Sequence, residues 1–241
     1  MKQYLLLFVF GALTLMTACD GGHLTRATAK AQLDPLFKKA TSINSGGPHP
    51  LLFQIGTISG ACNESVSKDY DVVESGAEYP VLSSTGYITI QQIKKHAWRV
   101  ELSERGRKSI AGEPYGHKQN GDDCDQWQVS MPLAKYDHMD ITGILEEGVH
   151  AKVDLAIVFA ITQAGMDARR VADKYVFELD KKKYGESLAQ SFLSDNVKSL
   201  LGDDVAFAPP SAHTYVNRAS VTFNKYDDGW KIDEHSAKDE K

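Results

Sequence analysis

The first nineteen residues constrain this chain more than any other stretch, because they set the compartment in which the rest must fold. One positive charge, Lys2, precedes an apolar run from Tyr4 to Leu15. A run of about a dozen residues is too short to cross a hydrocarbon core of ~30 Å as a helix, and it suits the apolar region of a cleaved export signal. We therefore expect residues 1–18 to be a signal peptide.

The end of this segment predicts lipid attachment. Met16, Thr17 and Ala18 precede Cys19 and resemble a lipobox, in which a large aliphatic residue and two small ones stand before an invariant cysteine. The resemblance implies cleavage before Cys19, diacylglycerol on its sulfur and, in many Gram-negative bacteria, a third acyl chain on the new amine. Each buried CH₂ contributes roughly 0.8 kcal/mol, so two or three chains anchor a protein stably. An ordinary secretory signal is the alternative.

The residue after the lipobox bears on the destination. Asp20 follows Cys19 directly. In the lipoprotein sorting system of enterobacteria, which the lipobox brings into consideration, Asp at this place marks retention in the inner membrane. We therefore expect a periplasm-facing lipoprotein of the cell envelope in the inner membrane, with the outer membrane as the other destination.

The two remaining cysteines, Cys62 and Cys124, are an even pair in an oxidising compartment, for which a disulfide is the first expectation. Closing a loop of this length stabilises by roughly 4 kcal/mol in the chain-entropy model. A metal pair lacks neighbouring ligands, and a catalytic thiol lacks an obvious partner. We expect the bond to join the two halves of the chain.

Charge and length narrow the class of protein. Lys2 is the only charged side chain that cleavage removes, which takes the net charge from −5 to −6. This acidic balance argues against binding to nucleic acid. The length suits one large domain or two small ones, and no second apolar run approaches transmembrane length.

The first half predicts a small helical domain with a hairpin. Residues 19–30 are polar and predict a lipidated tether, and residues 30–43 have helical spacing. Leu51–Ala61 is a second amphipathic stretch, although Gly56 and Gly60 weaken a helix there. Residues 88–92 and 98–102 alternate as two strands of a hairpin.

This hairpin segment resembles the back half of a winged-helix domain. The pattern "L…GYI" leads into it, and "V-x-L-[ST]-x-x-G-[RK]" leaves it at residues 100–107. The resemblance implies a winged-helix-like domain over residues 31–111. Winged helices usually bind DNA, but a lipidated periplasmic domain meets none, so the resemblance bears on shape and not on activity.

The second half predicts an antiparallel sheet with helices. Residues 112–123 are rich in Gly and polar residues and predict a linker, and residues 124–234 an α+β domain before a polar tail at 235–241. Alternation predicts hairpins at 140–162 and 216–233, whereas residues 169–179 are mixed and give no assignment. A helical stripe from Leu188 ends at Gly202. The fold class is therefore α+β, with two halves joined by the disulfide.

One segment concentrates positive charge. Residues 94–108 carry a net charge of +4, against −10 for the rest of the mature chain. This candidate binding patch would face anionic lipid, cell-wall polymer or an acidic protein, and a solvated hairpin face is the alternative interpretation. Its cations are Lys94, Lys95, Arg99, Arg105, Arg107 and Lys108.

Catalytic motifs are missing from the sequence. It holds no Gly-rich phosphate loop, no H-E-x-x-H and no G-x-S-x-G. The run Asp137-His138-Met139-Asp140 could place two ligands on one strand face, but zinc would need a third, from His150 or Asp154. Polar residues are common where a strand begins, so we predict no metal site, no cofactor and no catalytic residue.

Taken in order, the motifs are similar to those of uncharacterised proteobacterial envelope lipoproteins. These are the lipobox, a cysteine before the winged-helix-like segment ending in "L-S-x-x-G" (102–106), a second cysteine opening a strand-rich half, and a final hairpin "A-x-V-T-F-x-K-Y-D-D-G-W-K-I" (219–232). The resemblance implies no activity.

Three functions follow from these features. The first is a non-enzymatic binding or assembly role, with the membrane reached through Cys19 and an envelope protein as partner. The second is an immunity or inhibitor lipoprotein that neutralises a periplasmic effector. The third is an envelope hydrolase with an unrecognised site, which a pocket lined by perturbed acidic residues would favour.

Overall fold

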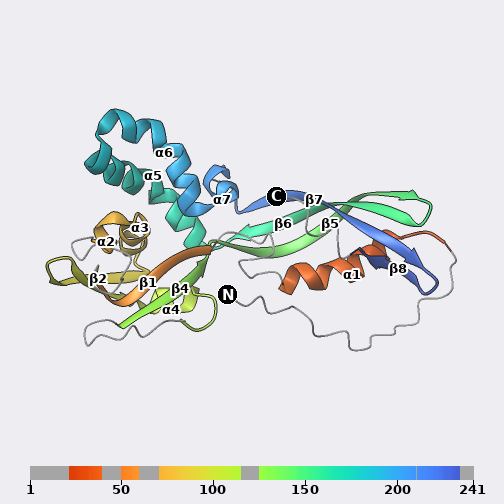
Figure 1. The fold of residues 1–241 in the computed structure, drawn as a ribbon, viewed down its shortest axis with the longest axis horizontal. Helices are drawn as coiled ribbons and strands as arrows, with labels where there is room; N and C mark the ends of the chain where they lie inside the picture. The colour runs from red at the N-terminus through yellow and green to blue at the C-terminus, as the bar shows by residue number, and fades with distance from the viewer. Residues whose placement is uncertain (1–21, 40–49, 60–70, 115–124, 210, 234–241) are drawn as a thin grey trace.

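A computed structural model describes residues 22–39, 50–59, 71–114, 125–209 and 211–233. Its strands form two antiparallel four-stranded sheets, in the orders β2-β3-β1-β4 (sheet A) and β5-β6-β7-β8 (sheet B). Sheet A lies with most of the helices at one end of an elongated molecule, and sheet B extends from it (Figure 1). The expected α+β class is confirmed.

Sheet A is built around β1 (Pro50–Ser59), which pairs with β3 (Ala97–Leu102) on one side and β4 (Asp125–Pro132) on the other. The edge strand β2 (Ile88–Lys94) forms a hairpin with β3. Two short helices, α2 (Val72–Ser75) and α3 (Glu78–Ser84), connect β1 to β2, and α4 (Glu104–Ser109) follows β3.

Sheet B is a meander of long strands. It consists of β5 (Ala134–Glu147), β6 (His150–Ile161), β7 (Thr214–Tyr226) and the short β8 (Gly229–Ile232). Alternate side chains of β6 are buried, as period-two patterning requires. Helix α1 (Arg26–Lys39) covers this buried face through Ala29 and Leu33.

The remaining helices connect β6 to β7. Helix α5 (Gln163–Tyr184) begins at the N-cap Thr162, whose hydroxyl accepts a hydrogen bond from the Gly165 amide. It is followed by α6 (Glu186–Leu201) and α7 (Asp203–Phe207). Helix α5 packs against α6 and α3, which ties this helical layer to sheet A.

The junction between the sheets depends on close backbone contact. Strands β4 and β5 are separated only by Leu133. The Leu133 carbonyl accepts from the Thr162 amide, and a methyl group on Gly165 would overlap that carbonyl oxygen. The start of α5 is therefore held directly against the point where one strand leaves sheet A and the next enters sheet B.

Several local expectations are confirmed. Both predicted hairpins of the second half are present as β5–β6 and β7–β8, and α6 ends at Gly202 as its sequence indicates. The 88–102 hairpin is present as β2–β3.

The described part of the second amphipathic stretch, residues 51–59, is a strand and not a helix. Leu51 and Phe53 are buried on β1, and Gly56 takes a positive φ of 97° where the Asp125 backbone approaches too closely for any side chain. Hydrogen bonds to β3 and β4 satisfy the backbone amides and carbonyls of this segment.

The expected division of the chain does not follow the sheets. Strand β4, expected in the second half, pairs with β1, and α1, expected in the first half, lies on β5. Each element buries its apolar face against a partner distant in sequence. Residues 22–25, expected in a tether, are also ordered, since Leu24 is 4% exposed and α1 begins at Arg26.

Candidate binding groove

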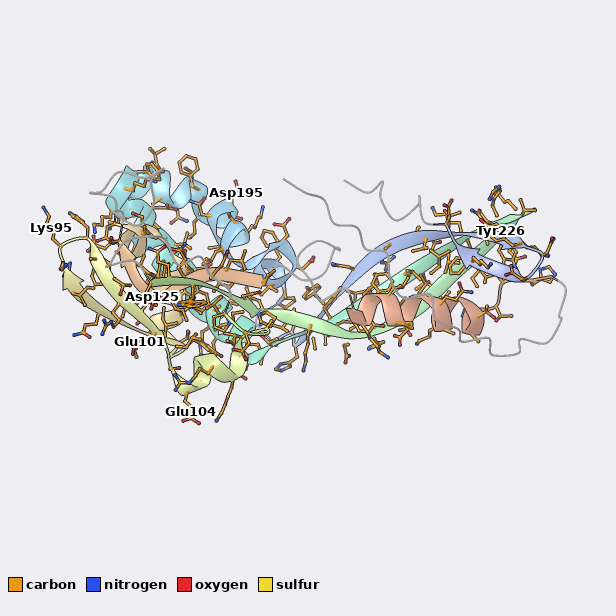
Figure 2. The ribbon with its side chains drawn as sticks, turned by 60° about the horizontal axis from the view of Figure 1, so that its bottom comes forward. Lys95, Glu101, Glu104, Asp125, Asp195 and Tyr226 are labelled. Carbon is orange, nitrogen blue, oxygen red and sulfur yellow. The ribbon has the colours of Figure 1, made fainter. Side chains whose placement is uncertain are left out.

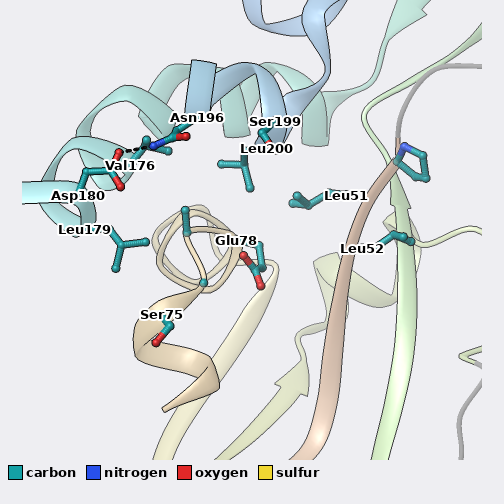
Figure 3. Close-up of a pocket in the computed structure, with 13 residues that line it drawn as sticks. Leu51, Leu52, Ser75, Glu78, Val176, Leu179, Asp180, Asn196, Ser199 and Leu200 are labelled. Carbon is teal, nitrogen blue, oxygen red and sulfur yellow. Dashed lines mark hydrogen bonds between the residues drawn. The ribbon is translucent and has the colours of Figure 1, made fainter. Parts of the chain in front are cut away.

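A groove of about 360 Å³ lies between the start of β1, the α2–α3 segment and the α5–α6 pair. Figure 3 shows side chains from all of these elements around it. Its apolar lining comes from Pro50, Leu51, Leu52, Val176, Leu179 and Leu200, and its polar side chains are Ser75, Glu78, Asp180, Asn196 and Ser199. An apolar lining with a few polar groups is typical of ligand sites.

Glu78 supplies the first carboxylate of the groove. It occupies the first turn of α3 and is half-buried, with its carboxylate folded over Gly76. Burial raises the pKa of Glu78, and its own backbone amide offsets part of that shift. The same carboxylate and, more strongly, burial raise the pKa of the neighbouring Tyr79, whose hydroxyl accepts from the Gln54 amide of β1 at 3.3 Å.

Asp180 supplies the second carboxylate. It is 7% exposed and stands at the end of the buried stripe of α5. Its Oδ2 accepts from Nδ2 of Asn196 on α6 at 2.6 Å (Figure 3). The remaining acceptor positions of Asp180, together with Glu78, give the groove an acidic character that suits a cationic or hydrogen-bond-donating group.

A polar cluster around the buried Asp167 connects helix α5 to the neighbouring elements. Asp167 is 3% exposed and accepts from Arg105, from Arg170 at 2.6 Å, from the Tyr87 hydroxyl at 3.0 Å and from Gln163 at 3.1 Å. The Arg105 guanidinium also lies over the Tyr87 ring, 4.4 Å from its centroid. This cluster joins α5 to α4 and to the segment that leads from α3 into β2.

Another buried carboxylate, that of Asp71 at the start of α2, contacts the β2–β3 hairpin. Asp71 caps α2 by accepting from the Glu74 amide at 2.9 Å, and it also accepts from the Trp98 indole at 2.8 and 2.9 Å. His96, with a positive φ of 57°, lies 3.5 Å from the same carboxylate. These contacts fix the hairpin to α2.

The structure separates the six cations of the predicted basic patch. Lys94, Lys95 and Arg99 lie along the β2–β3 hairpin, with Lys95 at its turn (Figure 2). The other three lie on α4 at the base of the hairpin, and each has a partner within the chain. Arg105 binds Asp167, Arg107 donates to the Leu102 carbonyl at 2.7 Å, and Lys108 pairs with Glu104 at 2.6 Å.

In the part of the chain that the structure describes, the fold does not bring a third ligand to residues 137–140, the run considered as a metal site. His138 contacts Asp137 at 3.0 Å and Asp140 at 3.7 Å, all exposed on β5. Within the described residues, no group of three or more His, Cys, Asp or Glu side chains is arranged to hold a metal ion. Cys19, Asp20, Cys62 and Cys124 lie outside the described residues.

Sequence reasoning did not find Glu78, Asp167 or Asp180. One signal was present for the last of these, because Ala164, Ala168, Ala172, Val176 and Asp180 repeat every four residues on α5. A carboxylate that continues a buried apolar stripe needs a partner, and here Asn196 provides it.

Comparison with known proteins gives no relative for this chain. No protein-family model, curated protein or solved structure matches it. Among the described helices, none is long and apolar enough to cross a membrane.

Proposed function

We propose that this chain is a lipid-anchored lipoprotein of the bacterial cell envelope, akin to the proteobacterial lipoproteins that its motifs resemble, with a non-enzymatic binding role. The lipobox at Cys19 supports the anchor. One observation carries the binding role, namely the groove in which Glu78 and Asp180 stand beside an apolar lining. The partner that suits this chemistry is an envelope protein or peptide presenting a cationic side chain next to an apolar one.

The experiment places a photo-crosslinking amino acid in the groove at Ser199 and, as a matched control, at Ser191. Both serines are exposed on α6, but only Ser199 lines the groove. In membranes containing the lipidated protein, we expect a discrete crosslinked partner from Ser199 that is absent from Ser191. Glu78→Gln combined with Asp180→Asn should abolish it. Equal crosslinking from both positions, or crosslinking unaffected by the double substitution, would contradict the proposal.

The anchor is tested separately. Mass spectrometry of the mature N-terminal peptide should find acyl chains on Cys19, and Cys19→Ala should release the protein from membranes. An unmodified Cys19 would remove this part of the proposal, whatever the groove binds. The distribution of the lipidated protein between inner and outer membranes tests the role of Asp20.

A hydrolase is the second candidate, and the same groove favours it. A carboxyl group whose pKa is raised can exchange protons nearer neutral pH than an ordinary glutamate, as acid–base catalysis requires. We place binding first because it needs only the acceptors and the apolar lining, whereas hydrolysis also needs a positioned water or nucleophile. Turnover of cell-wall fragments that is lost in Glu78→Gln would reverse this order.

We also propose the Cys62–Cys124 disulfide. Strand pairing sets Thr57 opposite Asp125, the residue directly after Cys124, and β1 ends at Ser59, three residues before Cys62. The described neighbours of the two cysteines are thus brought to the same end of the β1–β4 pair. Thiol titration of the unreduced, unfolded protein should find no reactive thiol at these positions, and two reactive thiols would refute the bond.

The winged-helix likeness remains a proposal about shape. The order β1, α2, α3, β2, β3 and the pairing of β1 with β3 support it for this part of the chain. The helix expected to open that domain instead covers sheet B.

A further inference from the structure

The first described residues are bound at the far end of sheet B. The Gly22 carbonyl accepts from Nζ of Lys225 at 3.0 Å and from the Trp230 indole at 3.3 Å. The Leu24 amide donates to Glu146 at 2.5 Å, and Leu24 itself is buried. The chain is therefore fixed to β5, β7 and β8 from Gly22 onward.

This attachment restricts where an acyl group on Cys19 can reach. Three peptide units separate Cys19 from Gly22, and a fully extended chain spans at most ~3.6 Å per residue. Cys19 is therefore within roughly 11 Å of Gly22, whatever path the intervening residues take. The membrane surface must lie close to this end of sheet B.

The same end exposes apolar side chains. Leu145 is 59% exposed, Val149 56% and Tyr226 53%. Val149 belongs to the β5–β6 turn, and Tyr226 is the last residue of β7 before the β7–β8 turn. The two hairpin ends meet where the Lys225 amide donates to the Val149 carbonyl at 2.8 Å. Aromatic side chains with a polar end favour the membrane–water interface.

The described residues at this end of sheet B carry no excess of positive charge that would attract anionic lipid. Lys231 pairs with Asp228 at 2.6 Å, and His23 contacts Glu146 at 3.0 Å. Two further carboxylates, Glu147 and Asp227, leave no excess of positive charge. Contact with a membrane at this end would rest on apolar and aromatic side chains and would not need anionic lipid.

The groove lies in the part of the molecule built on sheet A, away from this end of sheet B. Figure 2 shows Tyr226 at one extremity and Lys95, on the β2–β3 turn of sheet A, at the other. Strand β6 spans 12 residues between these regions, which corresponds to ~40 Å at about 3.3 Å per residue.

We propose that the end of sheet B formed by Leu145, Val149 and Tyr226 rests on the bilayer surface, so that sheet B is a stalk that holds the groove away from the membrane. This inference rests on the proposed lipid anchor at Cys19. It assigns the groove to partners in the periplasmic space or on an opposing surface, not to lipids of the membrane that carries the anchor.

The three tryptophans allow a direct test, because Trp230 lies in sheet B and Trp98 and Trp127 lie in sheet A. Full-length lipidated protein is reconstituted into phosphatidylcholine vesicles that contain a lipid with a nitroxide on its headgroup. One variant, Trp98→Phe with Trp127→Phe, retains only Trp230, and the complementary variant is Trp230→Phe. Circular dichroism checks that both are folded.

We expect strong nitroxide quenching of Trp230 and no quenching in the Trp230→Phe protein. Adding phosphatidylglycerol should not change this result. In the background that retains Trp230, Val149→Ser with Tyr226→Ser should weaken the quenching. The matched control Val216→Ser, also exposed on sheet B but away from the turns, should not.

Quenching that is equal at both ends, or that requires phosphatidylglycerol, would overturn the inference. So would quenching unaffected by the substitutions at Val149 and Tyr226, or a protein-concentration dependence showing that a second copy covers these residues. If the N-terminal peptide carries acyl chains but Trp230 is not quenched, only this inference fails. If the acyl chains are absent, the proposed anchor itself fails.

Discussion

Asp167→Asn is the substitution that best tests how the helical layer is held on sheet A. Asp167 is 3% exposed and accepts hydrogen bonds from four side chains, two of them arginines. Asparagine keeps the shape but offers one carbonyl oxygen, and its amide group faces donors. At least two of the four bonds are therefore lost, together with the charge that pairs with Arg105 and Arg170.

These contacts set the free energy of unfolding that Asp167→Asn loses. Breaking a fully buried ion pair by removing one partner costs about 3–5 kcal/mol. Here the Arg105 and Arg170 side chains are 45% and 70% exposed and regain water. The buried Tyr87 hydroxyl loses an acceptor, which costs about 1–3 kcal/mol. We expect a loss of about 3 kcal/mol, which for a chain of this size lowers Tm by ~6–12 °C.

Urea unfolding followed by tryptophan fluorescence measures this loss. The control is Asp173→Asn, the same change at an exposed position of the same helix, which should stay within ~0.5 kcal/mol of the wild type. If Asp167→Asn were as harmless as the control, the contacts of Asp167 would not be what holds α5 to α4.

Three further predictions follow from the same structure. A cation bound in the groove lowers the raised pKa of Glu78, so the affinity for a cationic peptide should rise with pH through that pKa and then level off, and Glu78→Gln should remove this dependence in calorimetric titrations. Burial raises the pKa of Tyr87 from 10.0 to about 12, so its contribution to stability is complete below pH 10 and is lost as the pH rises through 12. The Tyr87→Phe protein should therefore lose less stability than the wild type between pH 10 and 12, and an equal loss in both proteins would contradict this. Gly165→Ala places a methyl group on the Leu133 carbonyl and should cost about 2 kcal/mol or more in thermal unfolding, whereas Gly22→Ala, which has open space around it, should cost little.

Much of the local structure could be predicted because its patterns are short-range. Alternation located the β2–β3, β5–β6 and β7–β8 hairpins, and the apolar stripe of α6 ended at its glycine. Helix α5 was not assigned from its sequence, because Asp167 and Asp180 interrupt the apolar pattern of its inward face. Both carboxylates accept hydrogen bonds from side chains of other elements, Arg105 for Asp167 and Asn196 for Asp180.

The candidate site depends on contacts that no local pattern contains. Glu78 and Asp180 are 102 residues apart and line one groove because α3 and α5 pack together. The six clustered cations were the stronger signal in the sequence, yet Arg105 binds the buried Asp167 and Arg107 donates to the Leu102 carbonyl. Charge density along a chain does not indicate which charges a fold will use internally.

The sequence by itself determined the period of most of the elements and the prediction of an exported, lipid-anchored protein, because apolar alternation and a lipobox-like pattern both lie in consecutive residues. Only the tertiary structure decided that β4 joins β1, that α1 covers sheet B and that an acidic groove forms beside sheet A, away from Gly22. These features arise because each apolar face must be buried against whichever face complements it, and that partner lies far away along the chain.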